Sequence, residues 1–201
     1  SPSSRFLNVF GTTETLSWIG ASELDRPCTE TRIHEFWGAK MSIDAGEVVI
    51  ETQDLFSYYV GGAKRAKDAP LVFRTGDSGT QDANGDIVII GRLNDIINVG
   101  GTKVSPEEIE SALLENGLVK ETCCFGVPDQ WAGERVAAVI VLRETALDSA
   151  IAKKLLNEFL ISRLSSHKIP AHFLFFKELP RSDRGKISRQ AVKKKFLETP
   201  T

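Results

Sequence analysis

The chain has 201 residues, enough for one large domain or two small ones. Its net charge of −2 and pI of about 6.0 argue against a dominant surface for nucleic acid or anionic membranes. The three cysteines, Cys28, Cys123 and Cys124, are odd in number and do not favour a disulfide framework. Apolar runs are too short to span a bilayer, and no signal-peptide pattern is present. We therefore expect a cytoplasmic protein.

The first half of the sequence alternates short β-like runs with turns. Candidate strands cover Arg32–Trp37, Glu47–Thr52 and Leu71–Arg74. A hairpin is predicted where Asp82-Ala83-Asn84-Gly85 separates residues 79–81 from the apolar run Ile87–Ile90, because Asn-Gly tolerates positive φ. Residues 1–91 are expected to form an antiparallel β region.

The second half begins with a short candidate strand, Ile96–Val99, and then a helix. Ser105 can cap this helix, Pro106 suits its first position, and Glu108 completes a capping box. Gly117 is the predicted stop.

Two strands, a second helix, a further strand and a final helix follow. The strands are about Glu121–Val127, Arg135–Leu142 and His172–Phe176, and the last helix is Ser188–Phe196. The second helix starts near Asp148 and is predicted to bury Ile151, Leu155, Phe159 and Leu160. The predicted fold class is α+β: the antiparallel region is followed by a small α/β domain, residues 96–201, with the order βαββαβ.

Three segments carry candidate chemistry, and the first is Phe73-Arg74-Thr75-Gly76-Asp77. A strand is predicted to end there, with Gly76 turning the chain and Asp77 presented at the edge. A carboxylate in this position can accept two hydrogen bonds from a ribose diol. The alternative is a turn aspartate that caps its own backbone.

The second segment runs from Gly91 to Lys103. Arg92 could donate a fork of hydrogen bonds to sugar or phosphate oxygens. The paired glycines Gly100 and Gly101 permit close approach of a ligand, or else form a tight turn between two strands.

The third segment, Leu179–Arg189, places Lys186 beside Gly185. A lysine on a mobile loop can bring a cation to phosphate oxygens where negative charge develops. The alternative is a polar surface loop before a basic, solvated helix.

In this order and spacing, the segments resemble motifs of the AMP-forming superfamily of acyl-CoA synthetases, adenylation domains and luciferases. The matching segments are Phe10–Glu14 (aromatic-Gly-x-Thr-Glu), Phe73–Asp77 (Tyr-Arg-Thr-Gly-Asp), Gly91–Glu110 (the hinge and the next helix) and Pro180–Arg189 (the terminal lysine motif). The resemblance covers nearly the whole chain. It implies that residues 1–91 are the end of a large adenylate-forming domain, 92–95 a hinge and 96–201 a mobile lid.

The resemblance also implies roles for individual residues. Phe10 would pack on adenine, Thr13 would meet the α-phosphate, Glu14 would help to hold Mg²⁺, and Asp77 and Arg92 would bind the ribose hydroxyls.

Further roles concern the lid. Asn94 falls at the hinge, where the family usually has Asp or Lys. The loop with Gly100, Gly101 and Lys103 would line the tunnel of the thiol acceptor, and Lys186 would bridge carboxylate and phosphate during adenylation.

The implied activity is that of an AMP-forming acid–thiol ligase. A small carboxylic acid and ATP would give acyl-AMP and pyrophosphate, and the acyl group would pass to CoA. Lys168-Ile169-Pro170 and Leu179-Pro180 resemble the acyl-CoA synthetase branch. The family's phosphate loop and acyl pocket are not in the sequence, so we expect a part of a longer enzyme with little activity alone.

Two alternatives remain open at this point. One is an adenylation domain that loads the phosphopantetheine of a carrier protein. The other is a non-enzymatic nucleotide-binding or regulatory module.

Overall fold

The computed structural model describes residues 7–12, 15, 18–23, 31–35, 39–52, 72–143 and 148–199. The chain divides into two compact units, Ser1–Asn94 (unit 1) and Asp95–Thr201 (unit 2). The division falls inside the segment 92–95, whose role as a hinge remains a prediction. Within the described ranges, no helix combines the length and the apolar character needed to cross a membrane.

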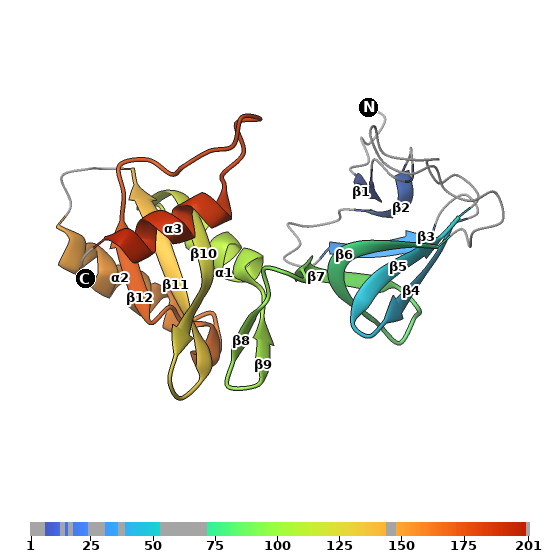
Figure 1. The fold of residues 1–201 in the computed structure, drawn as a ribbon, viewed down its shortest axis with the longest axis horizontal. Coiled ribbons are helices and arrows are strands. Elements are labelled where there is room, and N and C mark those ends of the chain that lie inside the picture. The colour runs from blue at the N-terminus through green and yellow to red at the C-terminus, as the bar shows by residue number, and fades with distance from the viewer. Residues whose placement is uncertain are drawn as a thin grey trace, which may run out of the picture. The chain divides into compact units, whose positions relative to one another are not determined.

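Unit 1 is an antiparallel β structure (Figure 1). Its described residues form seven strands in the sheet order β1-β2-β3-β7-β6-β5-β4, and adjacent strands in this order pair antiparallel. The strands are β1 (Leu7–Gly11), β2 (Trp18–Glu23), β3 (Thr31–Glu35), β4 (Lys40–Asp44), β5 (Glu47–Glu51), β6 (Val72–Gln81) and β7 (Ile87–Arg92). The antiparallel region predicted for the first half is confirmed.

The predicted hairpin of unit 1 is the β6–β7 pair. Gln81 and Ile87 are opposed at its end, and the turn is held by Asp82, whose Oδ1 accepts from the backbone N–H of Asn84 and of Asp86. Gly85 takes the positive φ of +92° that the turn requires. The core beneath the sheet consists of Ile33, Ala39, Met41, Val48, Ile50 and Ile87.

One prediction for this hairpin is wrong. The strand does not end at Gly76, because β6 continues through it to Gln81. Gly76 adopts a φ of +73° inside the strand, and Asp77 follows it as a buried residue of the ladder, opposite Arg92. The positive φ lies where the pairing of β6 with β5 shifts register, and the pairing of β6 with β7 begins at the next residue, Asp77.

Unit 2 contains a five-stranded mixed sheet among its described residues. The order is β10-β11-β8-β9, and β12 pairs parallel to β11. The elements are β8 (Ile97–Val99), β9 (Thr102–Val104), α1 (Pro106–Leu114), β10 (Val119–Asp129), β11 (Gly133–Leu142), α2 (Ser149–Ile161), the 3₁₀ turn η2 (Ser166–Lys168), β12 (His172–Phe175) and α3 (Arg189–Glu198). The mixed α and β character is as predicted, but β9 intervenes between the first strand and α1 in the expected βαββαβ order.

The central strands of unit 2 are buried on both faces. One face, with Cys124, Val136, Ala138 and Ile140, packs against side chains of α1 and α2. The other face, with Cys123, Phe125 and Val139 among its residues, packs against Val192 and Phe196 of α3 (Figure 1). Such two-sided burial explains why β10 and β11 are nearly continuous apolar runs. It also confirms that Cys123 and Cys124 are strand residues; Cys28 lies outside the described residues.

Helix α1 begins where predicted but not by the predicted cap. Pro106 is its first residue, yet Ser105 makes no side-chain cap hydrogen bond. The Ser105 hydroxyl instead donates to Glu107 Oε2 at 2.8 Å, and Glu108 binds Lys168 Nζ at 2.6 Å, so the capping box is absent. The helix ends at Leu114, before the predicted stop at Gly117.

Helix α2 starts where predicted but faces the core differently. Asp148 accepts hydrogen bonds from the N–H groups of Ala150 and Ile151. The residues that it buries are Ala152, Leu156 and Leu160, with Phe159 partly buried. Ile151 and Leu155 are exposed, so only half of the predicted stripe is correct.

Candidate functional site

The Asp77–Arg92 pair lies where β6 and β7 oppose each other in unit 1. Arg92 Nε is 3.0 Å from Asp77 Oδ1, and its Nη1 donates to the carbonyl oxygen of Thr75 at 2.9 Å. The carboxylate is only 9% exposed, whereas the guanidinium side chain is 61% exposed. The sequence-predicted pair is therefore brought together, as an oriented carboxylate beside an accessible fork of donors.

The backbone around Asp77 is fixed by neighbouring polar groups. Thr75 Oγ1 donates to the carbonyl oxygen of Val48 and accepts from the Asp77 N–H at 3.0 Å. The Gly76 N–H donates to Glu47 Oε1 at 2.9 Å, and the Leu93 N–H donates to the Gly76 carbonyl at 2.8 Å. These hydrogen bonds stabilise the positive φ of Gly76, and they thereby help to set the direction in which the Asp77 side chain projects from the strand.

Two other predicted nucleotide residues, Phe10 and Thr13, and the predicted metal residue Glu14 belong to the start of unit 1. Phe10 is on β1 opposite Gly20, half-buried and packed against the unit 1 core. Thr13 and Glu14 lie outside the described residues. In the part of the chain that the structure describes, no group of three or more His, Cys, Asp or Glu side chains is arranged to hold a metal ion.

The paired glycines form the turn of the β8–β9 hairpin in unit 2. Gly100 and Gly101 have φ values of +59° and +87°, and a Cβ on either would meet no atom within 4 Å. The Gly100 N–H donates to the Ala132 carbonyl at 2.8 Å, which joins this turn to the β10–β11 turn. Lys103, on β9, is exposed. The tight turn that the sequence allowed is present, and its surface is open.

Lys186 is exposed on a closed loop between β12 and α3. Arg181 and Ile187 form a β-bridge at the base of this loop. Inside it, the Ser182 N–H donates to the Lys186 carbonyl and the Gly185 N–H donates to the Ser182 carbonyl, both at 2.8 Å. Gly185 has a φ of +76°, which suits glycine at the tip. The loop of residues 181–187, here called the lysine loop, is therefore a small hydrogen-bonded hairpin.

Each end of the lysine loop is tied to other parts of unit 2. At the start, Arg181 Nη2 donates to Glu121 Oε1 at 2.6 Å, and its Nη1 donates to the Gly185 carbonyl. At the end, Ser188 caps α3 by accepting from the Ala191 N–H, and Arg189 follows as the first helical residue.

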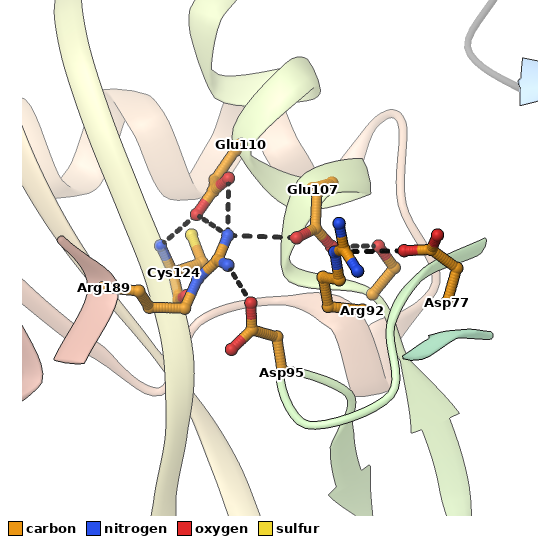
Figure 2. A network of polar contacts seen from close by, with 8 residues as sticks. Asp77, Arg92, Asp95, Glu107, Glu110, Cys124 and Arg189 are labelled. Carbon is orange, nitrogen blue, oxygen red and sulfur yellow. Dashed lines mark hydrogen bonds and ion pairs between the residues drawn. The ribbon is translucent and has the colours of Figure 1, made fainter. Parts of the chain in front are cut away.

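Arg189 is the centre of a polar cluster that sequence reasoning did not assign (Figure 2). Its Nη2 lies 3.0 and 3.1 Å from the two oxygens of Glu110 and 3.2 Å from Glu107 Oε1. Its Nη1 donates to Asp95 Oδ2 at 2.5 Å, and its Nε donates to the Cys124 carbonyl at 2.9 Å. The guanidinium thus satisfies three carboxylates and one backbone carbonyl with a side chain that is 22% exposed.

Burial and the neighbouring charges together set the pKa values in this cluster. Burial raises the pKa of the Glu110 carboxyl. The charge of Arg189 and the hydrogen bond that the Cys124 N–H donates to Glu110 Oε1 at 2.7 Å both lower it, but burial outweighs them. Burial alone would lower the pKa of Arg189, but the carboxylates of Glu110, Glu107 and Asp95 outweigh it and the pKa is raised. Arg189 therefore stays charged. The available sequence signal was weak: two acids one helical turn apart on α1, in a chain that ends in basic residues.

Comparison with known proteins shows which family the carboxyl-terminal part of the chain resembles. Residues 108–186, which include the lysine loop as far as Lys186, match the model of the AMP-binding enzyme C-terminal domain. Unit 2 contains an AMP-binding enzyme C-terminal domain. The resemblance to AMP-forming acyl-activating enzymes is confirmed.

The named relatives to which the chain is similar are ligases and synthetases. Oxalate–CoA ligase of Saccharomyces cerevisiae is 35% identical over 158 residues, which are 77% of this chain and 28% of the relative. Among solved structures, o-succinylbenzoate CoA synthetase from Bacillus subtilis with its acyl-adenylate intermediate is 25% identical with a TM-score of 0.78, over 93% of this chain and 40% of that one. The same synthetase with ATP and magnesium ion, at 24% identity over 94% of this chain and 41% of that one, has a TM-score of 0.79. The chain spans well under half the length of these proteins.

Proposed function

We propose that this chain supplies the carboxyl-terminal part of an AMP-forming acyl-CoA synthetase, an acid–thiol ligase. The observation that carries the proposal is Lys186, exposed on the closed lysine loop at the end of the matched C-terminal domain. A cation held in this way can enter a site where phosphate charge develops. The CoA-ligase names of the relatives support the same reaction class.

In the first step, a carboxylate oxygen of the acid attacks the α-phosphorus of ATP, and pyrophosphate leaves. Asp77 and Arg92 fit the ribose, because the oriented carboxylate accepts from hydroxyl groups and the exposed guanidinium donates to oxygen. Lys186 aligns the attacking carboxylate and stabilises the charge on the phosphate. Mg²⁺ would offset phosphate charge when bound, and Glu14 is the residue of this chain proposed to help hold it.

In the second step, the thiol of CoA attacks the acyl carbonyl and AMP leaves. The Gly100–Gly101 turn is proposed to guide the thiol arm, because it has no side chain and is open to solvent. Figure 1 shows the β8–β9 turn and the segment between β12 and α3 at opposite ends of unit 2. Because these two parts cannot serve one ligand in one orientation, we propose that unit 2 rotates about Asn94 between the steps.

The decisive experiment is Lys186→Ala in the complete enzyme that contains this chain. ATP–pyrophosphate exchange should fall about 10²- to 10³-fold, because one stabilising contact to developing charge is lost. Lys194→Ala, on the exposed side of α3, is the control and should leave exchange unchanged. Unchanged exchange in the Lys186 variant would show that this chain supplies no catalytic cation and would instead support its role as a non-enzymatic nucleotide-binding module.

The thiol acceptor is tested separately. We propose CoA, on the support of the relatives' names, over the phosphopantetheine of a carrier protein. The complete enzyme is incubated with ATP, an acid and either CoA or a holo-carrier protein. Faster product formation on the carrier protein would reverse the assignment.

A further inference from the structure

The lysine loop carries its functional cation at an exposed tip, so its orientation depends on its two ends. The start of the loop is held at the surface by Arg181, whose side chain is 47% exposed. The end of the loop passes directly into Arg189, which lies two residues after Ile187 and is far more buried. The deeper of the two attachments is therefore at the Arg189 end.

The contacts of Arg189 connect this end to three separate parts of unit 2. Glu110 belongs to α1, Cys124 to β10, and Asp95 is the residue that follows the proposed hinge position. These residues are 79, 65 and 94 positions away along the chain. A single planar guanidinium therefore fixes the end of the lysine loop against the helix, the sheet and the first residue of the unit (Figure 2).

Glu110 completes the attachment from the other side. Its Oε1 accepts from the Cys124 N–H, while Arg189 Nε donates to the Cys124 carbonyl. Both polar groups of this one residue in β10 are thereby bonded to the Glu110–Arg189 pair. The position of the guanidinium is set by the sheet itself and not only by the flexible carboxylate side chains.

We propose that Arg189 is a positioning residue for Lys186, an inference that rests on the proposed role of Lys186 in adenylation. Arg189 does not contact substrate in this role. It fixes the end of the lysine loop so that the Lys186 ammonium reaches the phosphate in one orientation. Asp95, held by the same guanidinium, couples this orientation to the segment from which unit 2 begins.

The test variant is Arg189→Lys, because alanine would leave three carboxylates facing an empty position and threaten folding. Lysine keeps the charge but cannot direct separate donors at Asp95, Glu110 and the Cys124 carbonyl together. Glu110→Gln is the second variant: it keeps an acceptor for the Cys124 N–H and removes the charged partner of Arg189. Arg135→Lys, at an exposed pair with Asp129, is the matched control.

The first measurement needs no activity and uses the 201-residue chain. In Arg189→Lys, hydrogen exchange at the Ser182 and Gly185 amides should become about tenfold faster or more, because opening of the lysine loop becomes easier. Exchange at Ile140, in the core of β11, should stay unchanged. Equal acceleration at both places, or none in the loop, would overturn the positioning role.

The second measurement separates the two half-reactions in the complete enzyme, with oxalate among the acids tested as substrate. Adenylation in Arg189→Lys should fall about 10- to 100-fold, because small misplacements of a reacting group have effects of this size. Transfer from preformed acyl-adenylate to CoA, which does not use Lys186, should change less than about twofold on the same basis. Glu110→Gln should shift the same step in the same direction.

The outcomes distinguish this inference from the proposed function. Equal loss of both half-reactions means that Arg189 is merely structural and refutes the inference. Normal adenylation in Lys186→Ala refutes the proposed function, and the hydrogen-exchange result still decides whether Arg189 holds the loop. Collapse in Lys186→Ala with normal adenylation in Arg189→Lys refutes the positioning role alone.

Discussion

Asp77 and Arg92 are opposed across the β6–β7 pair, with the buried carboxylate of Asp77 bound by Nε of the exposed Arg92. The strand register sets this relationship, because the two residues are Cα partners in the ladder. The register therefore keeps the two side chains next to each other, and the largely buried Asp77 carboxylate lies beside the exposed guanidinium. The Asp77 carboxylate can accept hydrogen bonds from two neighbouring hydroxyl groups of one ligand.

Asp77→Asn should raise the KM for ATP in the adenylation step. A hydrogen bond to a charged group contributes about 1.5–3 kcal/mol, so the increase should be roughly 10- to 100-fold. The measurement is pyrophosphate exchange over a range of ATP concentrations in the complete enzyme. Asp82→Asn, at the turn of the same hairpin, is the control and should leave the KM unaltered. An unaltered KM in both variants would show that Asp77 does not bind the nucleotide.

Gly101→Ala should slow acyl transfer to CoA by about tenfold and leave adenylation intact. The φ of +87° at Gly101 strains any residue with a Cβ, although the added methyl group would contact nothing. Gly117→Ala is the control, because an added methyl group there would also contact nothing and the backbone of Gly117 lies outside the left-handed region. Both half-reactions are measured in each variant. Loss of adenylation in Gly101→Ala would contradict a role confined to the thiol step.

Cys123 should make unit 2 less stable at alkaline pH. Burial raises the pKa of this thiol to about 12, whereas an unfolded cysteine has a pKa of about 8.5. Between these values the folded state retains a proton that the unfolded state has lost, so the free energy of unfolding falls as pH rises. One thiol contributes at most about 1.4 kcal/mol per pH unit.

Urea unfolding of Cys123→Ala at several pH values tests this expectation. The difference at neutral pH gives the packing cost of the lost sulfur, and only the further change with pH reports the thiol. The variant should lose less stability than the natural chain between about pH 8.5 and the highest pH at which both fold. Parallel curves for the two proteins would show that Cys123 does not contribute.

Leu156→Ala should destabilise unit 2 by about 2–5 kcal/mol, because the side chain is fully buried. Leu155→Ala, on the adjacent residue, should cost under about 1 kcal/mol, since Leu155 is 43% exposed. Far-ultraviolet circular dichroism during urea unfolding measures both, because the described α-helices all lie in unit 2. Equal losses would mean that α2 packs with the other face.

This pair of leucines shows where sequence reasoning reached its limit in the fold. The existence of α2 and its start near Asp148 were predictable from the apolar pattern, and the structure adds that the Asp148 side chain caps the helix. The buried face was not. Two adjacent rows of the helix are apolar, and the row that faces the core consists of Ala152, Leu156 and Leu160. Periodicity alone could not choose between neighbouring rows.

The same distinction applies to the candidate site. Asp77 and Arg92 were expected at one site only through the family resemblance, which assigns both to the ribose. Their pairing across β6 and β7 was not expected, because the first strand was predicted to end at Gly76. The cluster around Arg189 could not be predicted, since Glu110 and Asp95 are 79 and 94 residues distant and no local pattern specifies which charges meet. The lysine loop was predicted as a polar segment, but its closure by backbone hydrogen bonds depends on Gly185 and on the Arg181–Ile187 bridge.

Strand β10 lies at an edge of the unit 2 sheet, with eleven residues and a largely apolar sequence. Such an edge offers unpaired backbone groups to which a strand of another molecule can add. At Cys124, the N–H and the carbonyl of this edge are bonded to Glu110 and Arg189. At this one residue of the edge, neither backbone group is therefore available to a strand added from another molecule.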